Sequence, residues 1–201
     1  MISIFLLWAA CAVSAADCHA LMEMKGVVPE APGLAFGTEA RFDNEIETIT
    51  CSSVLRRGRP VACVQRLHVT TVGVVVERCI PNPPLRPVRD SEVHGSTSGY
   101  LDRLVVRGAA VSFVRLNLPG WSFVSSPVFC GDRIAYWAPI RNGNSFKVYL
   151  RVFDLGSRKL VANAFFRNDT LETDDSGYLP DIRWTEPGTD VVAGAFAVHV
   201  R

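Results

Sequence analysis

The sequence lacks an excess of charge of either sign. Its 21 lysine and arginine residues nearly balance its 20 aspartate and glutamate residues. A balanced chain creates no overall field that would attract nucleic acid or an anionic membrane surface. We therefore expect no nucleic-acid partner.

Metal-binding motifs are also missing. No Cys-x-x-Cys pair occurs, and the four histidines are scattered along the chain at His19, His68, His94 and His199. Zinc sites need cysteine or histidine ligands at short, regular spacings. The sequence therefore predicts no metal site of this kind and no cofactor.

A membrane-spanning run is absent, but a short apolar segment opens the chain. Residues 2–9 carry no charge, and the small residues Ser14–Ala16 precede the polar Asp17. The apolar run is well short of the roughly 20 residues that a spanning helix needs. The pattern is typical of a secretory signal peptide over residues 1–16. We therefore expect a secreted or periplasmic protein with no transmembrane segment.

Cys11 leaves a second processing route open. In bacterial lipoproteins a cysteine of the signal is lipidated and becomes the new N-terminus, and a leucine three residues earlier is preferred. Here Trp8 occupies that position, and Leu7 lies one residue further away. Simple secretion is the favoured interpretation, and a lipid anchor at Cys11 is the alternative.

Five cysteines remain after either route: Cys18, Cys51, Cys63, Cys79 and Cys130. Exported chains meet an oxidising environment, so we expect two disulfides and one unpaired thiol. Cys51 and Cys63 are equidistant from Arg57, and a hairpin turning there would place them opposite one another at bridging distance. The second bridge has three candidate pairings, of which Cys79–Cys130 is favoured.

Strand signals dominate the chain after a short predicted helix, which runs from an N-cap at Asp17 to a terminating Gly26. Beyond it, stretches rich in β-branched and aromatic residues alternate with turn residues. These stretches are 45–51, 61–80 (broken near Gly73), 110–118, 123–136, 146–153, 159–167 and 191–200. Many short strands without a long helical pattern predict one antiparallel all-β domain over residues 17–201.

A proline-rich segment interrupts these strands. Four of the seven residues in 81–87 are prolines. Proline cannot donate a hydrogen bond to a neighbouring strand, so this segment does not belong in a central strand. We expect a surface crossing here, or a division of the domain into two lobes near residues 81–90.

Three segments in the C-terminal half resemble parts of β-propeller blades. Pro127–Tyr136 places a turn before an apolar strand, and Val148–Val161 is similar to a blade strand that runs into an aspartate and turns through a glycine. Pro180–Gly194 combines an aromatic residue, a Pro-Gly turn and an apolar strand. The resemblance implies a small or incomplete propeller, because a closed one needs at least four blades. A β-sandwich is the equal alternative.

Two polar segments superficially match functional motifs. His94–Gly99, with Asp102 behind it, is similar to a hydrolase nucleophile loop, but Thr97 stands where the serine must be. The acidic segment 169–181 has part of the spacing of a calcium loop, but Arg183 replaces its last, bidentate glutamate. We expect polar loops at both places, with a looser calcium site as the alternative at the second.

Arg56, Arg57 and Arg59 place three positive charges on a predicted hairpin tip. Arginine is suited to bidentate pairing with carboxylates. The tip is therefore the favoured binding site for an acidic partner surface, the alternative being that these charges only keep the turn soluble.

The sequence favours an exported, non-catalytic β-rich protein that binds another protein, such as an inhibitor or an immunity-type protein against a secreted enzyme or toxin. It assigns no catalytic residue. One alternative is an extracytoplasmic hydrolase of cell-wall or extracellular polymers, which two carboxylates about 5–10 Å apart across a cleft would indicate. The other alternative is a structural component of the cell envelope.

Overall fold

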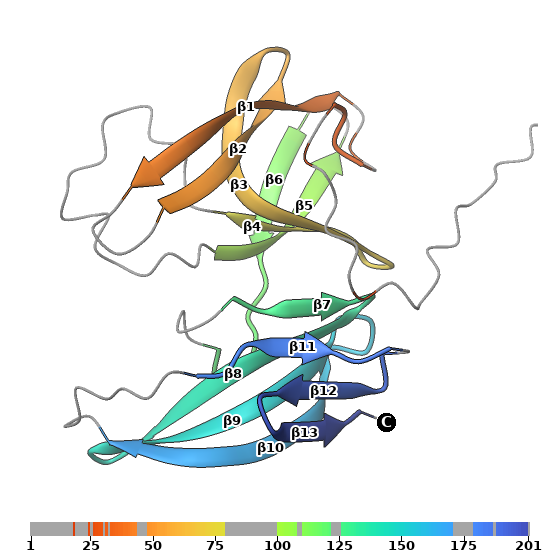
Figure 1. The fold of residues 1–201 in the computed structure, drawn as a ribbon. Coiled ribbons are helices and arrows are strands. Elements are labelled where there is room, and N and C mark those ends of the chain that lie inside the picture. The colour runs from red at the N-terminus through yellow and green to blue at the C-terminus, as the bar shows by residue number, and fades with distance from the viewer. Residues whose placement is uncertain are drawn as a thin grey trace, which may run out of the picture.

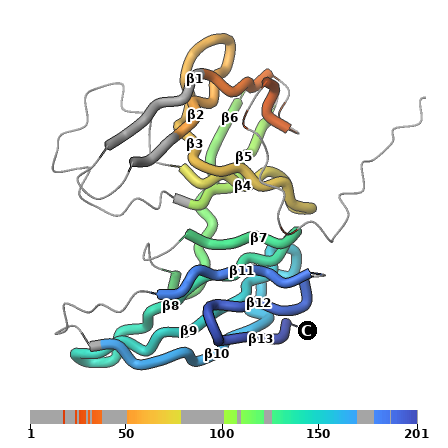
Figure 2. Tube along the Cα trace, viewed as in Figure 1, coloured from red at the N-terminus to blue at the C-terminus, as the bar shows by residue number. Residues whose placement is uncertain are grey.

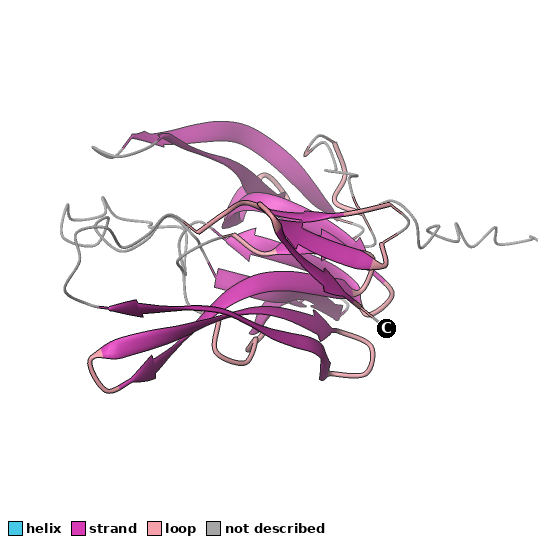
Figure 3. Cartoon of the chain, turned by 60° about the horizontal axis from the view of Figure 1, so that its bottom comes forward, coloured by secondary structure: helices cyan, strands magenta, loops and turns pink. Residues whose placement is uncertain are grey.

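The computed structural model describes residues 18, 24, 26–29, 31, 33–43, 48–78, 100–107, 110–121, 126–170, 179–186 and 188–200. This part of the chain contains thirteen strands and no helix, and all paired strands are antiparallel (Figure 3). The all-β, antiparallel class is therefore confirmed. Most of the helix predicted over residues 17–26 lies outside the described residues, and Cys18, Met24 and Gly26 are not helical.

The first sheet has six strands, each paired with the next along the chain. Figure 1 shows that it curls into half a barrel. Its strands are β1 (Leu34–Asp43), β2 (Thr48–Arg56), β3 (Arg59–Thr70), β4 (Gly73–Arg78), β5 (Tyr100–Arg107) and β6 (Ala110–Arg115). β1 and β6 therefore form the two edges of this sheet.

β4 is buried on both of its faces. Val74 and Val76 belong to an apolar cluster on one face, whereas Val75 belongs to a second cluster on the other. Side chains alternate between the faces of a strand, so an uninterrupted valine run is typical of a strand that is covered on both sides. We call the face that bears Val75 the junction face, because it packs against the next sheet.

The β2–β3 hairpin turns through two residues, Arg57 and Gly58, which have φ angles of 49° and 75°. Two successive positive φ angles are typical of a type I′ turn, whose twist matches that of the flanking strands. The turn pairs Arg56 with Arg59, and an irregularity beyond it places Cys63 opposite Ser53. Cys63 is thus out of line with Cys51 and is a free, buried thiol. The predicted Cys51–Cys63 bridge is wrong.

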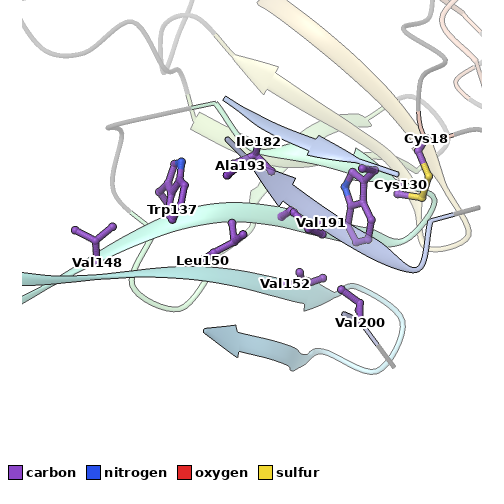
Figure 4. Close-up of a cluster of buried hydrophobic side chains, with 12 residues drawn as sticks. Cys18, Cys130, Trp137, Val148, Leu150, Val152, Ile182, Val191, Ala193 and Val200 are labelled. Carbon is purple, nitrogen blue, oxygen red and sulfur yellow. A yellow bond between two sulfur atoms is a disulfide. The ribbon is translucent and has the colours of Figure 1, made fainter. Parts of the chain in front are cut away.

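The C-terminal part forms two smaller sheets that pack face to face (Figure 2). The four-stranded sheet contains β7 (Val128–Cys130), β8 (Arg133–Asn142), β9 (Ser145–Asp154) and β10 (Lys159–Thr170). The three-stranded sheet contains β11 (Ile182–Trp184), β12 (Asp190–Ala193) and β13 (Phe196–His199). Trp137 and Trp184 both belong to the apolar core between them, and Figure 4 shows Trp137 in this core. Their indole N–H groups donate to Pro180 O and Val128 O, both at 3.0 Å, so neither buried donor is left without a partner.

A disulfide between Cys18 and Cys130 joins the N-terminal segment to β7 (Figure 4). The predicted Cys79–Cys130 bridge is therefore wrong, because the fold brings Cys18 to Cys130 instead. Gly188 packs against this bridge with a φ of 87°, and a Cβ there would lie 2.7 Å from Sγ of Cys130. Only glycine fits that position. Cys51 is also disulfide-bonded, and its partner lies outside the described residues.

A third apolar cluster joins the junction face to the four-stranded sheet. Val75 and Leu101 from the first sheet pack with Phe129, Ile134 and Tyr136 from the second. The change from one sheet to the next falls at residues 116–127. Residues 81–90 lie outside the described residues, and the strands on either side of them, β4 and β5, pair directly in one sheet.

The Cys18–Cys130 bridge predicts a large loss of stability when it is removed. Cys18→Ala with Cys130→Ala should lower the free energy of unfolding by about 4 kcal/mol, because the bridge closes a loop with a sequence separation of 112. Denaturant titration measures this loss. Cys63→Ala is the control, because it breaks no crosslink and should cost only about 1 kcal/mol. Equal stabilities for the double variant and the parent, or a peptide map joining Cys130 to any other cysteine, would contradict the assignment.

Candidate functional site

The arginine tip consists of Arg56, Arg57 and Arg59 at the β2–β3 turn. Arg57 and Arg59 are exposed and Arg56 is half-buried. Direct pairing of Arg56 with Arg59 across the turn holds the three residues together on one short element. In Figure 1 this turn is at the top of the first sheet, away from the two smaller sheets.

The three arginines of the tip carry charges that no described residue neutralises. None of them makes an ion pair within the described part of the chain. The neighbouring residues Leu55, Pro60 and Val61 are uncharged. The charges of the three tip arginines are therefore available to a partner.

A buried ion cluster lies on the face of the first sheet opposite the junction face. Asp102 is 1% exposed and accepts from Nε of Arg78 and, at 2.9 Å, from Nε of Arg115. The guanidinium of Arg78 also lies 4.8 Å from the centre of the Phe113 ring, a cation–π contact. One carboxylate therefore serves two guanidinium groups.

A cavity of about 360 Å³ opens between the first sheet and the β9–β10 turn. Arg103 on β5 and Arg158 in the turn line it, and Arg115 on β6 borders it while its guanidinium is bound to Asp102 on the opposite face. Its remaining lining is mostly apolar and includes Val114, which is 48% exposed. The cavity thus combines positive charge with apolar surface.

Glu77 is fully buried on the junction face. Burial raises the pKa of its carboxyl, because the charged form loses water. Arg66, whose Nε lies 3.7 Å from Oε2 of Glu77, opposes that shift. Glu77 is therefore a weakly compensated acid in the interior.

His68 lies on the same face and stacks on Phe129, with ring centroids 3.6 Å apart and planes 10° from parallel. Burial, helped by the charge of Arg66, lowers the pKa of His68 to about 4. Its Nε2 is buried and has no hydrogen-bond partner. The imidazole is therefore neutral near pH 7 and acts as an aromatic packing residue.

Cys63 is a free thiol, although the sequence analysis placed it in a bridge with Cys51. It lies buried on β3, and this burial raises the pKa of its thiol. A protonated, buried thiol is a poor nucleophile. Cys63 therefore does not have the environment of a catalytic cysteine.

The structure describes only part of the two polar segments that superficially matched functional motifs. His94–Gly99 lies outside the described residues, while Asp102 is committed to Arg78 and Arg115. In the acidic segment, residues 171–178 lie outside the described residues, and Asp169 pairs with Arg167 at 2.8 Å. Within the described ranges, no group of three His, Cys, Asp or Glu side chains could hold a metal ion.

Sequence reasoning located the arginine tip but missed the cavity. The tip residues are neighbours in the chain, and a turn signal lies between them. Arg103, Arg115 and Arg158 come from three separate elements, and only the packing of the sheets brings them around one space. No local pattern could have shown that arrangement.

The buried His68 predicts a specific dependence of stability on pH. Its pKa is about 4 in the folded state and 6.5 in its ordinary state, so the unfolded chain binds more protons between these values. Stability should therefore fall as pH falls from 6.5 to 4, by up to roughly 3 kcal/mol. His68→Phe keeps a ring against Phe129 and removes this titration. Its unfolding free energy relative to the parent should rise between pH 7.5 and pH 4.5.

Denaturant titrations at the two pH values measure that change. His199→Phe is the control, because the side chain of His199 is 64% exposed and is not stacked in the junction. It should show no such gain at pH 4.5. A difference between His68→Phe and the parent that stays constant with pH would contradict the role of His68.

The described residues include no helix long and apolar enough to cross a membrane. Comparisons of the chain with protein families, with curated proteins and with solved structures found no match. The interpretation of the site therefore depends on its geometry and charge.

Proposed function

We propose that this is an exported, non-catalytic binding protein that recognises an acidic surface of another protein through its arginine tip. An inhibitor of a secreted enzyme and an immunity-type protein are the roles that fit this description. The single observation that carries the proposal is the two-residue turn that presents Arg57 and Arg59 to solvent with Arg56 beside them.

The rigidity of the tip supports this role. A type I′ turn at Arg57 and Gly58 leaves no loop to order when a partner binds, so the entropic cost of binding is small. Arginine side chains pair with carboxylates through two parallel hydrogen bonds. A preformed cluster of three such side chains therefore suits an acidic protein surface.

Export is supported by the crosslinks. Cys18–Cys130 and the bridge at Cys51 are compatible with an oxidising compartment, where disulfides form and persist. We propose a secreted or periplasmic location after removal of residues 1–16. A lipid anchor at Cys11 remains the alternative.

The finer fold assignment belongs to the same proposal. The four-stranded sheet is an antiparallel meander, the form of a propeller blade, and Pro127–Tyr136 and Val148–Val161 lie on its hairpins. Pro180–Gly194 spans β11 and β12. These placements support a propeller-like arrangement, while the face-to-face packing of the two smaller sheets supports the sandwich alternative.

A pull-down from the native extracellular or periplasmic fraction tests this function. The triple variant Arg56→Gln, Arg57→Gln, Arg59→Gln should bind the captured partner roughly tenfold more weakly, or not at all. The parent interaction should also weaken with added salt, because exposed charges are screened.

The matched control replaces three exposed arginines that lie elsewhere, Arg107→Gln, Arg141→Gln and Arg183→Gln, and so removes the same charge. It should capture the partner as the parent does. Capture of no partner by the parent, or equal capture by the tip variant, would contradict the proposal.

A further inference from the structure

We propose that the cavity between the first sheet and the β9–β10 turn binds a small amphipathic monocarboxylate, with its carboxylate on the arginines and its hydrocarbon part against the apolar wall. This site is separate from the arginine tip, and the inference goes beyond the proposed function. Four observations support it.

The first observation is the charge of the lining. Arg103 and Arg158 line the cavity, and no acidic side chain among the described residues lines it. Arg103 and Arg158 make no ion pair within the described part of the chain. The lining therefore offers two guanidinium groups that no described carboxylate holds in an ion pair.

The second observation is that the nearest carboxylates lie at the rim of the cavity and accept hydrogen bonds from other groups. Arg115 also borders the cavity, but its guanidinium is bound to Asp102 on the opposite face of the first sheet, so its charge is already paired. Asp132 and Asp154 lie near Gly156 at the rim, where a Cβ on Gly156 would be 3.8 and 3.6 Å from their oxygens.

These two rim carboxylates are already engaged by hydrogen-bond donors. Asp132 accepts from the backbone N–H of Thr71 at 2.7 Å and from its hydroxyl. Asp154 accepts from the backbone N–H and the hydroxyl of Ser157, both at 2.7 Å. Within the described part of the chain, neither carboxylate forms an ion pair with Arg103 or Arg158.

The third observation is the apolar wall. Its residues are Val72, Val114, Leu116, Leu118, Phe153 and Leu155. Val114 is 48% exposed, which leaves a large part of its surface in contact with water. A hydrocarbon chain placed there would remove that surface from water, at a gain of roughly 25 cal/mol per Å².

The fourth observation is the size of the space. A volume of about 360 Å³ is near the lower end of the range for small-molecule sites. The planar guanidinium matches a carboxylate bidentately, and the apolar wall matches a short chain better than a polyanion. The chemistry points to one carboxylate on a short hydrocarbon body.

Isothermal titration calorimetry with sodium decanoate tests the site. The parent should bind decanoate saturably, whereas decan-1-ol, which has no charge, and sodium sulfate, which has no hydrocarbon, should each bind at least roughly tenfold more weakly. Val114 methyl signals in NMR spectra should shift with decanoate over the same concentration range. Absence of decanoate binding, or equal binding of decan-1-ol or sulfate, would overturn the proposal.

Variants locate the carboxylate. Arg103→Gln should raise the Kd for decanoate roughly tenfold, and Arg158→Gln, in an exposed turn, provides a second test that does not depend on the sheet. Arg107→Gln is the matched control, because Arg107 is on the same strand and does not line the cavity. It should leave the Kd unchanged. A parental Kd in both cavity variants, or an equal rise in the control, would overturn the assignment.

A variant of the arginine tip separates a failure of this inference from a failure of the proposed function. The triple variant at Arg56, Arg57 and Arg59 should bind decanoate with the parental Kd, because the tip does not line the cavity. A cavity that binds decanoate while the tip captures no protein would contradict only the proposed function. A tip variant that loses decanoate binding would contradict the cavity assignment.

Discussion

The packing of the six-stranded sheet against the four-stranded sheet is the constraint on which the other features depend. Val75 and Leu101 on one side meet Ile134 and Tyr136 on the other, and all four are fully buried. This apolar contact fixes the position of one sheet against the other. It thereby creates the cavity and encloses the polar residues of the junction face.

Burying charged side chains costs electrostatic free energy. The partners that offset this cost differ between the two faces of the first sheet. Asp102 has two guanidinium partners, so its charge is well compensated. Burial shifts the pKa of Glu77 upward, and Arg66, at 3.7 Å, and Ser126 offset this shift only in part. Charged groups enclosed with few partners reduce stability and are often found where a protein binds or reacts. The junction face therefore holds a buried acid whose charge the fold compensates only in part.

Much of the fold could be predicted from periodicity, because alternation reports a strand with one buried face. The break near Gly73 and the strand over residues 146–153 correspond to the β3–β4 turn and to β9. β5 was missed because its charged Asp102 and Arg103 disrupt the apolar pattern, and Asp102 is buried only because arginines from neighbouring strands neutralise it. Such a residue is polar in the sequence and part of the core in the fold.

The disulfides show a second limit of local reasoning. The prediction for Cys51 assumed a symmetric turn, and the two-residue turn with its irregularity moved Cys63 out of line. The partner of Cys130 is distant in the chain and depends on how the sheets assemble. The arginine tip needed only neighbouring residues, so its place on a turn could be predicted. The cavity is formed where three separate elements pack together, so its position could not be predicted from the sequence.

The central claim is that the apolar junction makes the two sheets one cooperative unit. Amide hydrogen exchange in increasing denaturant, with the disulfides intact, tests this most directly when β4 and β5 are compared with β8 and β9. The account predicts that both pairs of strands exchange through a single opening with the same free energy, which also matches the loss of tryptophan fluorescence from Trp137 and Trp184. Exchange of β4 and β5 at a lower denaturant concentration, while β8 and β9 stay protected, would contradict it.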